Sequence, residues 1–170
     1  IKIDGFNILP VLSLSMAITT FVGQNYGAGQ MDRIKKGMWT TLIMTVLYTL
    51  ISGSLLYHFA PKLIGLFTKD LKVIEAGVLA SKFLCPFYFL LAILHSLAGT
   101  VRGTGKTVPP MIILLLSLCL FRIMAAKFVI PHYHTIENVY KLYPISWLIG
   151  VVLMVGYTIK VDWIGENKIS

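Results

Sequence analysis

The chain has 170 residues, of which 56% are hydrophobic and 13% charged, and its mean hydropathy is +0.80. This composition excludes an ordinary water-soluble domain, whose apolar residues form short stripes, because uncharged stretches here reach membrane-spanning length. The net charge of +8 does not indicate nucleic-acid binding, since the basic residues are scattered at the ends of these stretches and form no run. We therefore expect an all-α integral membrane protein whose basic residues face the headgroups of the lipid bilayer.

Five uncharged stretches predict five transmembrane helices, because about 20 residues are needed to cross about 30 Å of hydrocarbon. The fourth stretch is shorter than this, so its helix has to include Arg122. Strands of a β-barrel are excluded because runs such as Pro110–Leu116 show no alternation of polar and apolar residues. In chain order, the expected spans are residues 3–25, 37–60, 76–101, 108–130 and 142–161.

Asp4 lies at the start of the first expected span, about 28 Å along a helix from the turn at Gly23. The other acidic residues fall in loops or at span ends. A carboxylate at membrane depth can hold Na⁺ or H⁺ in one state and release it in another, so Asp4 is a candidate for cation binding. Because Ile1 falls inside or just outside an apolar segment, we expect helices upstream of this chain.

The third expected span contains Pro86, which predicts a kink, and then Tyr88 and His95. Aromatic faces can bind flat organic cations through cation–π contacts, and packing against lipid or protein explains the same residues. His95 could carry a proton in a proton-coupled carrier, or it could be a hydrogen-bonded packing residue. Tyr88 and His95 are therefore candidates for substrate binding, with packing as the alternative.

The fourth expected span carries Arg122, about 22 Å along a helix from Thr107. A charge in the membrane costs several kcal/mol unless it faces a cavity, finds a partner or reaches an interface. Arg122 is therefore either a structural anchor or a residue that contacts substrate.

The cysteines and histidines indicate neither a disulfide nor a metal site. The two cysteines give no disulfide framework, and His132 with His134 lacks a third ligand, so we expect no metal site.

The connections between the spans predict the orientation of the chain. The connections after the first and third spans, together with the segment after the fifth, have to share one side of the membrane. They carry more lysine and arginine than the two opposite connections, which favours the cytoplasm on their side. The C-terminus is therefore expected to be cytoplasmic.

Glycine-rich turns follow the first and third spans, at Val22–Gly29 and Arg102–Thr107. Glycine can end a helix with a positive φ or let two backbones approach closely. The second turn resembles the end of a phosphate loop, but Thr100 replaces the first glycine and the preceding element is a membrane helix, so nucleotide binding is not expected. We expect structural roles for Gly23, Gln24, Asn25, Gly27, Arg102, Gly103 and Gly105.

Four segments, in this order and spacing, resemble the C-terminal lobe of the multidrug and toxic compound extrusion (MATE) family: Ile18–Gly29, Asp32–Gly37, Leu66–Asp70 and Arg102–Pro109. The resemblance covers residues 1 to about 130. It implies a cell-membrane antiporter of two six-helix lobes that expels organic cations and other amphipathic drugs in exchange for Na⁺ or H⁺. This chain is similar to helices eight to twelve of that architecture.

The resemblance also implies that the missing N-terminal lobe of the same polypeptide is the partner of this chain, and that the chain alone is inactive. No cofactor is expected. Similar proteins carry a basic residue near Arg122, often followed by Ile-Pro, whereas Met124 here removes the expected kink. One branch of the family has an acid eleven residues before the arginine of the Arg-Gly turn. That position is Leu91 here, so we expect the principal coupling carboxylate in the N-terminal lobe.

Two other functions remain open at this point. A flippase of lipid-linked sugars, from the wider superfamily, would need a strongly cationic central cavity, for which the candidates are Lys82, Arg122 and Lys127. An inactive membrane remnant or scaffold is the second, because five helices without the other lobe cannot form a transport path. We do not expect an enzyme, since the spans contain no catalytic triad, paired acids or histidine-rich motif.

Overall fold

The structure is a computed structural model, and it describes residues 4–132 and 136–160. Within these ranges the chain is helical, without a strand, and five of its helical segments are long and apolar enough to cross a membrane. This confirms the all-α membrane fold with five spans. The elements are α1 (Asp4–Gly27), α2 (Met31–Gly65), α3 (Leu71–Leu84), the 3₁₀ turn η1 (Cys85–Phe87), α4 (Tyr88–Gly103), α5 (Val108–Leu114), the π-helical segment η2 (Leu115–Leu120), α6 (Phe121–His132) and α7 (Ile136–Lys160).

Two helical spans are longer than the apolar stretches that predicted them. Helix α2 continues through Pro61 to Gly65, and the third span already begins at Leu71. With 35 residues, α2 is about 52 Å long and exceeds the hydrocarbon thickness, so its polar ends extend into the headgroup region. Pro61 has no N–H group to donate to the carbonyl of Tyr57, four residues earlier, and the helix continues for about one turn beyond it.

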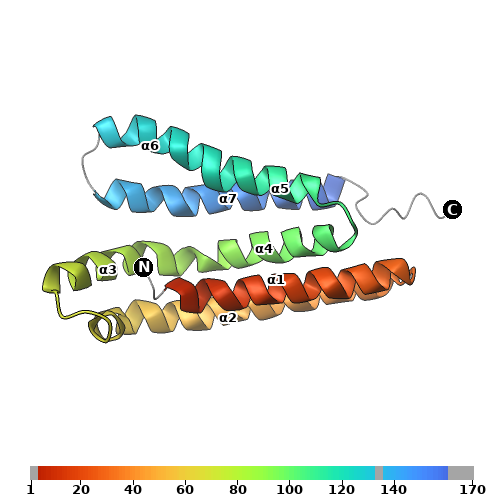
Figure 1. The fold of residues 1–170 in the computed structure, drawn as a ribbon, viewed down its shortest axis with the longest axis horizontal. Helices are drawn as coiled ribbons and strands as arrows, with labels where there is room; N and C mark the ends of the chain where they lie inside the picture. Colours follow the sequence, from red (N-terminus) through yellow and green to blue (C-terminus); the bar gives the residue numbers. More distant parts are fainter. Residues whose placement is uncertain (1–3, 133–135, 161–170) are drawn as a thin grey trace.

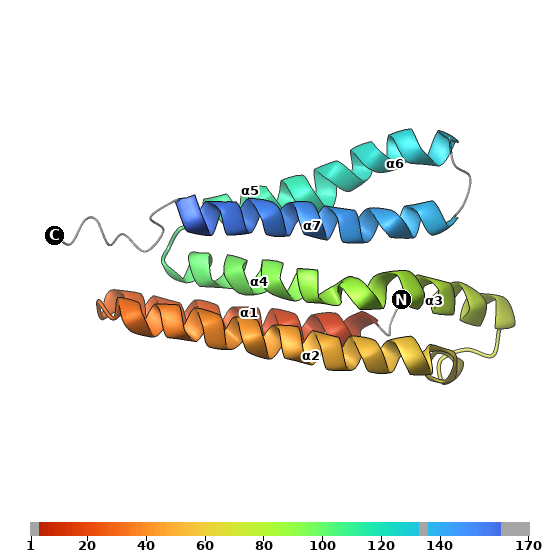
Figure 2. The ribbon, with the colours of Figure 1, turned by 180° about the vertical axis from the view of Figure 1, so that it is seen from behind.

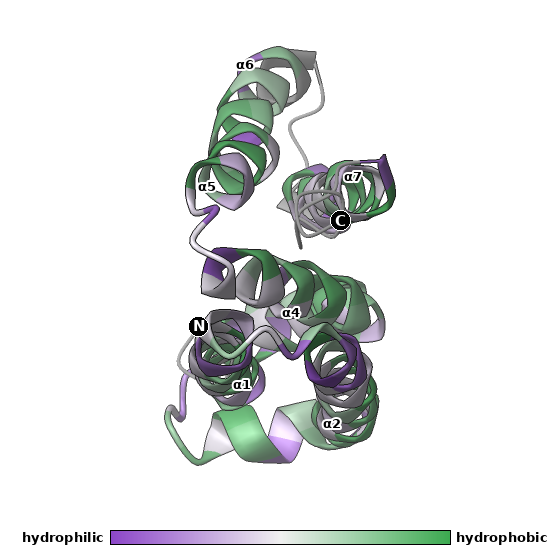
Figure 3. Cartoon of the chain, turned by 90° about the vertical axis from the view of Figure 1, so that its right-hand side faces the viewer, coloured by the Kyte–Doolittle hydropathy of each residue, from purple (hydrophilic) through white to green (hydrophobic). Residues whose placement is uncertain are grey.

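The helices run side by side in two layers (Figures 1 and 2). Helices α1, α2 and the α3–α4 pair form one layer, and the α5–α6 pair with α7 forms the other. Seen along the helices, α4 lies between α7 and the α1–α2 pair (Figure 3). The α1–α2 connection, the α4–α5 connection and the C-terminal end of α7 lie at the same end of the bundle (Figure 1). The two connections and the C-terminal end of α7 therefore share one side, as the sequence requires.

The third span is the central one. In its most apolar window 56% of the residues are buried, against 11% to 28% in the other four spans. Leu94, Ala98 and Val101 of α4 are fully buried, and they pack with Val22 of α1 and Met154 of α7. Helix α4 therefore links the two layers.

Small residues and hydroxyl groups hold α4 against α1. A Cβ atom at Gly99 would lie 2.5 Å from the carbonyl oxygen of Ser15, and one at Gly103 would lie 2.7 Å from that of Thr19. The Thr19 hydroxyl donates a 2.9 Å hydrogen bond to the Gly99 carbonyl, and the Ser15 hydroxyl donates a 2.6 Å bond to the carbonyl of His95. Membrane helices typically associate in this way, because apolar burial gives little gain in lipid.

The third and fourth spans depart from a regular α-helix. The third span bends at η1, where Pro86 removes a backbone donor, and this confirms the predicted kink. The fourth span has its prolines, Pro109 and Pro110, in its first turn, and farther along residues 115–120 form the π-helical segment η2. The widened turns of a π-segment rotate the residues that follow it relative to a straight helix. Arg122 lies directly after this segment.

Candidate functional site

A cavity of about 270 Å³ lies among α1, α4, α7 and the η2–α6 segment. We call it the aromatic hollow. It contains the three residues that the sequence singled out for substrate contact, because Tyr88, His95 and Arg122 all line it. Among the residues that the structure describes, the lining consists of Ile8, Leu12, Leu84, Tyr88, Leu91, His95, Leu118, Arg122, Tyr143 and Trp147.

Arg122 is held by two contacts with α7. Its Nε atom donates a 2.8 Å hydrogen bond to the hydroxyl of Ser146, and its guanidinium carbon lies 4.2 Å from the centre of the Tyr143 ring. The Ser146 hydroxyl in turn donates to the Tyr143 carbonyl at 2.7 Å, which fixes the direction of its lone pairs. The side chain of Arg122 is half-buried and lines the hollow beside Tyr143.

Three aromatic rings continue from this cation towards the core. Trp147 meets Tyr143 edge to face at 6.4 Å between ring centres, and it lies 5.6 Å from the ring of Tyr88 in a tilted arrangement. Trp147 and Tyr88 are 4% and 2% exposed, so their positions are fixed by packing. Tyr143 is half-buried and offers a ligand more area than the other two rings, and an aromatic surface can stack against a flat apolar ligand and attract a positive charge.

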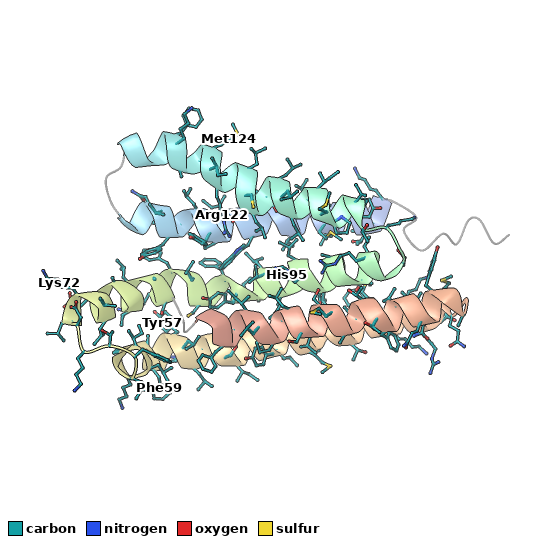
Figure 4. The ribbon with its side chains drawn as sticks, viewed as in Figure 1. Tyr57, Phe59, Lys72, His95, Arg122 and Met124 are labelled. Carbon is teal, nitrogen blue, oxygen red and sulfur yellow. The ribbon has the colours of Figure 1, made fainter. Side chains whose placement is uncertain are left out.

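His95 lines the same hollow from α4 and is half-buried. Figure 4 labels His95 and Arg122, which come from the two different layers of the bundle. The backbone of His95 is tied to α1 through Ser15, whose hydroxyl also accepts a 3.0 Å hydrogen bond from Arg102 Nη2. Within the described ranges the imidazole itself forms no hydrogen bond, so its nitrogens are available to a molecule in the hollow.

Leu91 and Asp4, the two positions considered for cation binding, lie in different parts of the structure. Leu91 is 6% exposed and forms part of the wall of the hollow, where an acid would face Arg122 and His95 from the same cavity. Asp4 begins α1, one turn before the lining residue Ile8, and its side chain lies outside the described part of the structure.

The residues of the glycine turns differ in what they contact. Gly105 has a φ of 84°, and Gly29, which the sequence did not single out, has a φ of 70°, so both require glycine in a left-handed turn. Gly103 lies against α1, whereas a Cβ at Gly23 would make an ordinary 3.5 Å contact and one at Gly27 would meet nothing within 4 Å.

The polar residues of the first turn also differ in their contacts. Asn25 Nδ2 donates to the Phe21 carbonyl at 2.7 Å, and the carbonyl of Asn25 accepts from Gln30 N. Gln24 is exposed.

The remaining candidates lie away from the hollow. Lys82 and Lys127 are exposed and do not line it, so Arg122 is the one lysine or arginine among the lining residues. His134 falls outside the described ranges. Among the residues that the structure does describe, no group of three histidine, cysteine or acidic side chains could hold a metal ion.

Sequence reasoning did not identify the wall that α7 contributes. Tyr143, Ser146 and Trp147 are spaced three and four residues apart and therefore share a helix face, which is a readable signal. Two of them contact Arg122, which belongs to another helix. Gly99 was also missed, although Gly99 and Gly103 form the Gly-x-x-x-Gly pattern that is typical of closely packed membrane helices.

Comparison with known proteins identifies the family. The family profile described as MatE matches residues 1–127, which is most of the 170-residue chain. The chain belongs to the MatE family. This confirms the resemblance to multidrug and toxic compound extrusion proteins and establishes a relationship to transporters rather than to enzymes.

The curated relatives of this chain are named as multidrug resistance proteins. The chain is 32% identical to the "Probable multidrug resistance protein NorM" of Thermotoga maritima over 133 residues, which are 78% of this chain and 29% of that relative. It is 24% identical to the "Probable multidrug resistance protein YoeA" of Bacillus subtilis over 155 residues, which are 88% of this chain and 32% of the relative. The chain thus spans about a third of the length of these relatives.

Proposed function

We propose that this chain forms most of the C-terminal lobe of a multidrug exporter that moves amphipathic aromatic compounds, organic cations among them, out of the cell. Membership of the MatE family and the names of the curated relatives support the transport class. The observation that carries the proposal is the aromatic hollow. His95 lies about 12 Å from the end of α4 at Gly103, and Tyr88 about 22 Å, so the hollow lies at mid-membrane depth, where transporters bind their substrates.

In this proposal the complete protein consists of this lobe and an N-terminal lobe, with the substrate path between them. The C-terminus lies in the cytoplasm of the cell, at the end of the bundle that carries the more basic connections. An inward gradient of Na⁺ or H⁺ drives export, and the principal coupling carboxylate belongs to the N-terminal lobe. A purified preparation of residues 1–170 alone, reconstituted into liposomes, should therefore show no ion-driven ethidium movement.

A flippase for lipid-linked sugars is less well supported. Such a protein would need several cations around its cavity to bind the pyrophosphate of its substrate. Lys82 and Lys127 are exposed and lie outside the hollow, so Arg122 alone supplies a permanent positive charge to the lining.

The exporter can be tested with one pair of tryptophan variants in the complete protein. Expression in a host that lacks its main drug exporters should lower the accumulation of ethidium. Trp147→Leu should abolish most of this effect, because Trp147 is the central ring of the hollow. Trp39→Leu is the matched control, since Trp39 is 59% exposed and lies outside the hollow. Normal efflux by a correctly folded Trp147→Leu protein would contradict the proposal.

A further inference from the structure

The guanidinium of Arg122 is only partly occupied by its contacts with α7. Nε is bonded to Ser146, and one face of the planar group lies on the ring of Tyr143. Neither Nη atom has a hydrogen-bond partner among the described residues, and no carboxylate in those ranges forms an ion pair with Arg122. The group is therefore fixed in direction while its outer edge, which carries the two Nη atoms, remains available.

This arrangement determines which chemical group the outer edge can bind. The N–H groups of the two Nη atoms form a planar fork that matches the two oxygens of a carboxylate. A cation inside a membrane protein is costly without a counter-charge, so an anionic ligand group gains more here than it would in water. A second cation at the same edge would instead be repelled.

The rest of the hollow is suited to an aromatic body attached to that group. Beyond Tyr143 the wall continues with the rings of Trp147 and Tyr88, and Leu91 and Leu118 complete an apolar surface. Trp147 and Tyr88 are almost fully buried and form a rigid floor with little free area, so a flat ligand would lie mainly against the half-buried Tyr143, His95 and Leu118. A volume of about 270 Å³ leaves room for a compound of two fused rings.

We propose that the aromatic hollow is a binding site for aromatic carboxylates, with the carboxylate on the Nη edge of Arg122 and the ring system against Tyr143 and Leu118, over the buried rings of Trp147 and Tyr88. This inference rests on the proposed exporter and narrows its substrate class. Compounds that carry a carboxylate, including zwitterions, bind in the hollow in preference to simple cations. Purely cationic drugs such as ethidium contact only the aromatic part of the hollow, and they bind there more weakly because Arg122 repels their charge.

Direct binding to the complete protein in lipid nanodiscs tests this site. Equilibrium dialysis with 2-naphthoate, 2-naphthamide and 2-naphthylmethylammonium compares three ligands with the same ring system and different charge. We expect 2-naphthoate to bind at least about tenfold more tightly than the neutral amide, as is typical of a charge-assisted bidentate contact. The ammonium compound should bind most weakly of the three.

Variants then assign the preference to Arg122. Arg122→Gln should remove the advantage of 2-naphthoate and leave the affinity for 2-naphthamide within about twofold, and Arg122→Lys should keep part of the advantage. Lys127→Gln, an exposed charge on the same helix, is the matched control and should keep all of it. If Arg122→Gln does not fold, Ser146→Ala replaces it, because loss of the Nε anchor should reduce the advantage several-fold.

The outcomes separate this site from the exporter itself. Equal affinities for the acid and the amide, or an advantage that survives Arg122→Gln, overturns the carboxylate site. Equal affinities would also be the result if an acidic side chain from the rest of the protein already occupied Arg122. Ethidium efflux measured on the same variants tests the exporter separately, because ethidium has no carboxylate. Efflux without the carboxylate preference leaves the exporter standing, and the preference without any efflux overturns the exporter and retains the site.

Discussion

The two layers of the bundle differ in the contacts that hold the helices of each layer together. Helix α4 lies on α1 through glycine and hydroxyl groups, so that the backbones of Gly99 and Ser15 nearly touch. Helix α6 meets α7 mainly through side chains, with the guanidinium of Arg122 on Tyr143 and Ser146. Backbone contacts cannot be adjusted without moving a whole helix, whereas side-chain contacts can rearrange. The aromatic hollow lies between the rigid layer and the adaptable one.

The largest expected effect comes from placing a methyl group in the rigid contact. Gly99→Ala would bring Cβ to 2.5 Å from the Ser15 carbonyl oxygen and 2.6 Å from its hydroxyl, so the helices have to separate. We expect a loss of about 3 kcal/mol in the free energy of unfolding of the complete protein, measured by denaturant titration in detergent. Gly27→Ala, which meets nothing within 4 Å, is the control and should change it by less than about 1 kcal/mol. Equal losses in both variants would show that α4 does not depend on close approach to α1.

A methyl group added to a helix of the adaptable layer should lower the free energy of unfolding by less than Gly99→Ala does. At Gly150 of α7, an added Cβ would lie 2.8 Å from Leu94 Cδ2 and 2.9 Å from Ser117 Oγ. Both atoms are at the ends of side chains, which can rotate away. Gly150→Ala should therefore cost about 1 to 2 kcal/mol in the same titration. A loss as large as that of Gly99→Ala would contradict the distinction between the two layers.

Hydrogen bonds across the rigid contact are expected to contribute less than its shape. Ser15→Ala removes the hydroxyl that donates to the His95 carbonyl and accepts from Arg102. Polar contacts between membrane helices average about 0.6 kcal/mol and reach about 1.7 kcal/mol, so a loss in that range is expected. Ser13→Ala is the control, since Ser13 is exposed and bonds only to Leu9 of its own helix. If both substitutions were neutral, shape alone would hold α4 on α1.

The membrane spans were easier to predict from the sequence than the contacts between them. The lengths of the uncharged stretches predict the spans, and Pro86 predicts the irregularity at η1. Both features depend on residues that are close together in the sequence. The cost of a membrane charge indicates that Arg122 needs a partner, but its partners Tyr143 and Ser146 lie on another helix. The π-helical segment before Arg122 contains neither proline nor glycine, so no residue in it indicates the irregularity. Contacts between helices remote in sequence require the fold.

The smallest expected effect concerns cation coupling, and it tests whether the rigid layer takes part in the transport cycle. Asp4 begins α1, which is bonded to α4 at Ser15 and Thr19, so an ion that bound there would act on the layer that is least able to move. A coupling carboxylate has to change its environment between states, and the acids that the structure describes on the other helices, Asp32, Asp70 and Glu75, are all exposed near helix ends. We therefore expect Asp4→Asn in the complete protein to leave most of the Na⁺- or pH-driven efflux of ethidium, measured in proteoliposomes with an imposed gradient. Neutralising each acid at membrane depth in the N-terminal lobe provides the comparison, and one of these changes should abolish coupling. If Asp4→Asn alone abolished the dependence on the gradient while every N-terminal change was tolerated, the coupling site would lie at the start of α1, and the rigid layer would be the part of this lobe that responds to the ion.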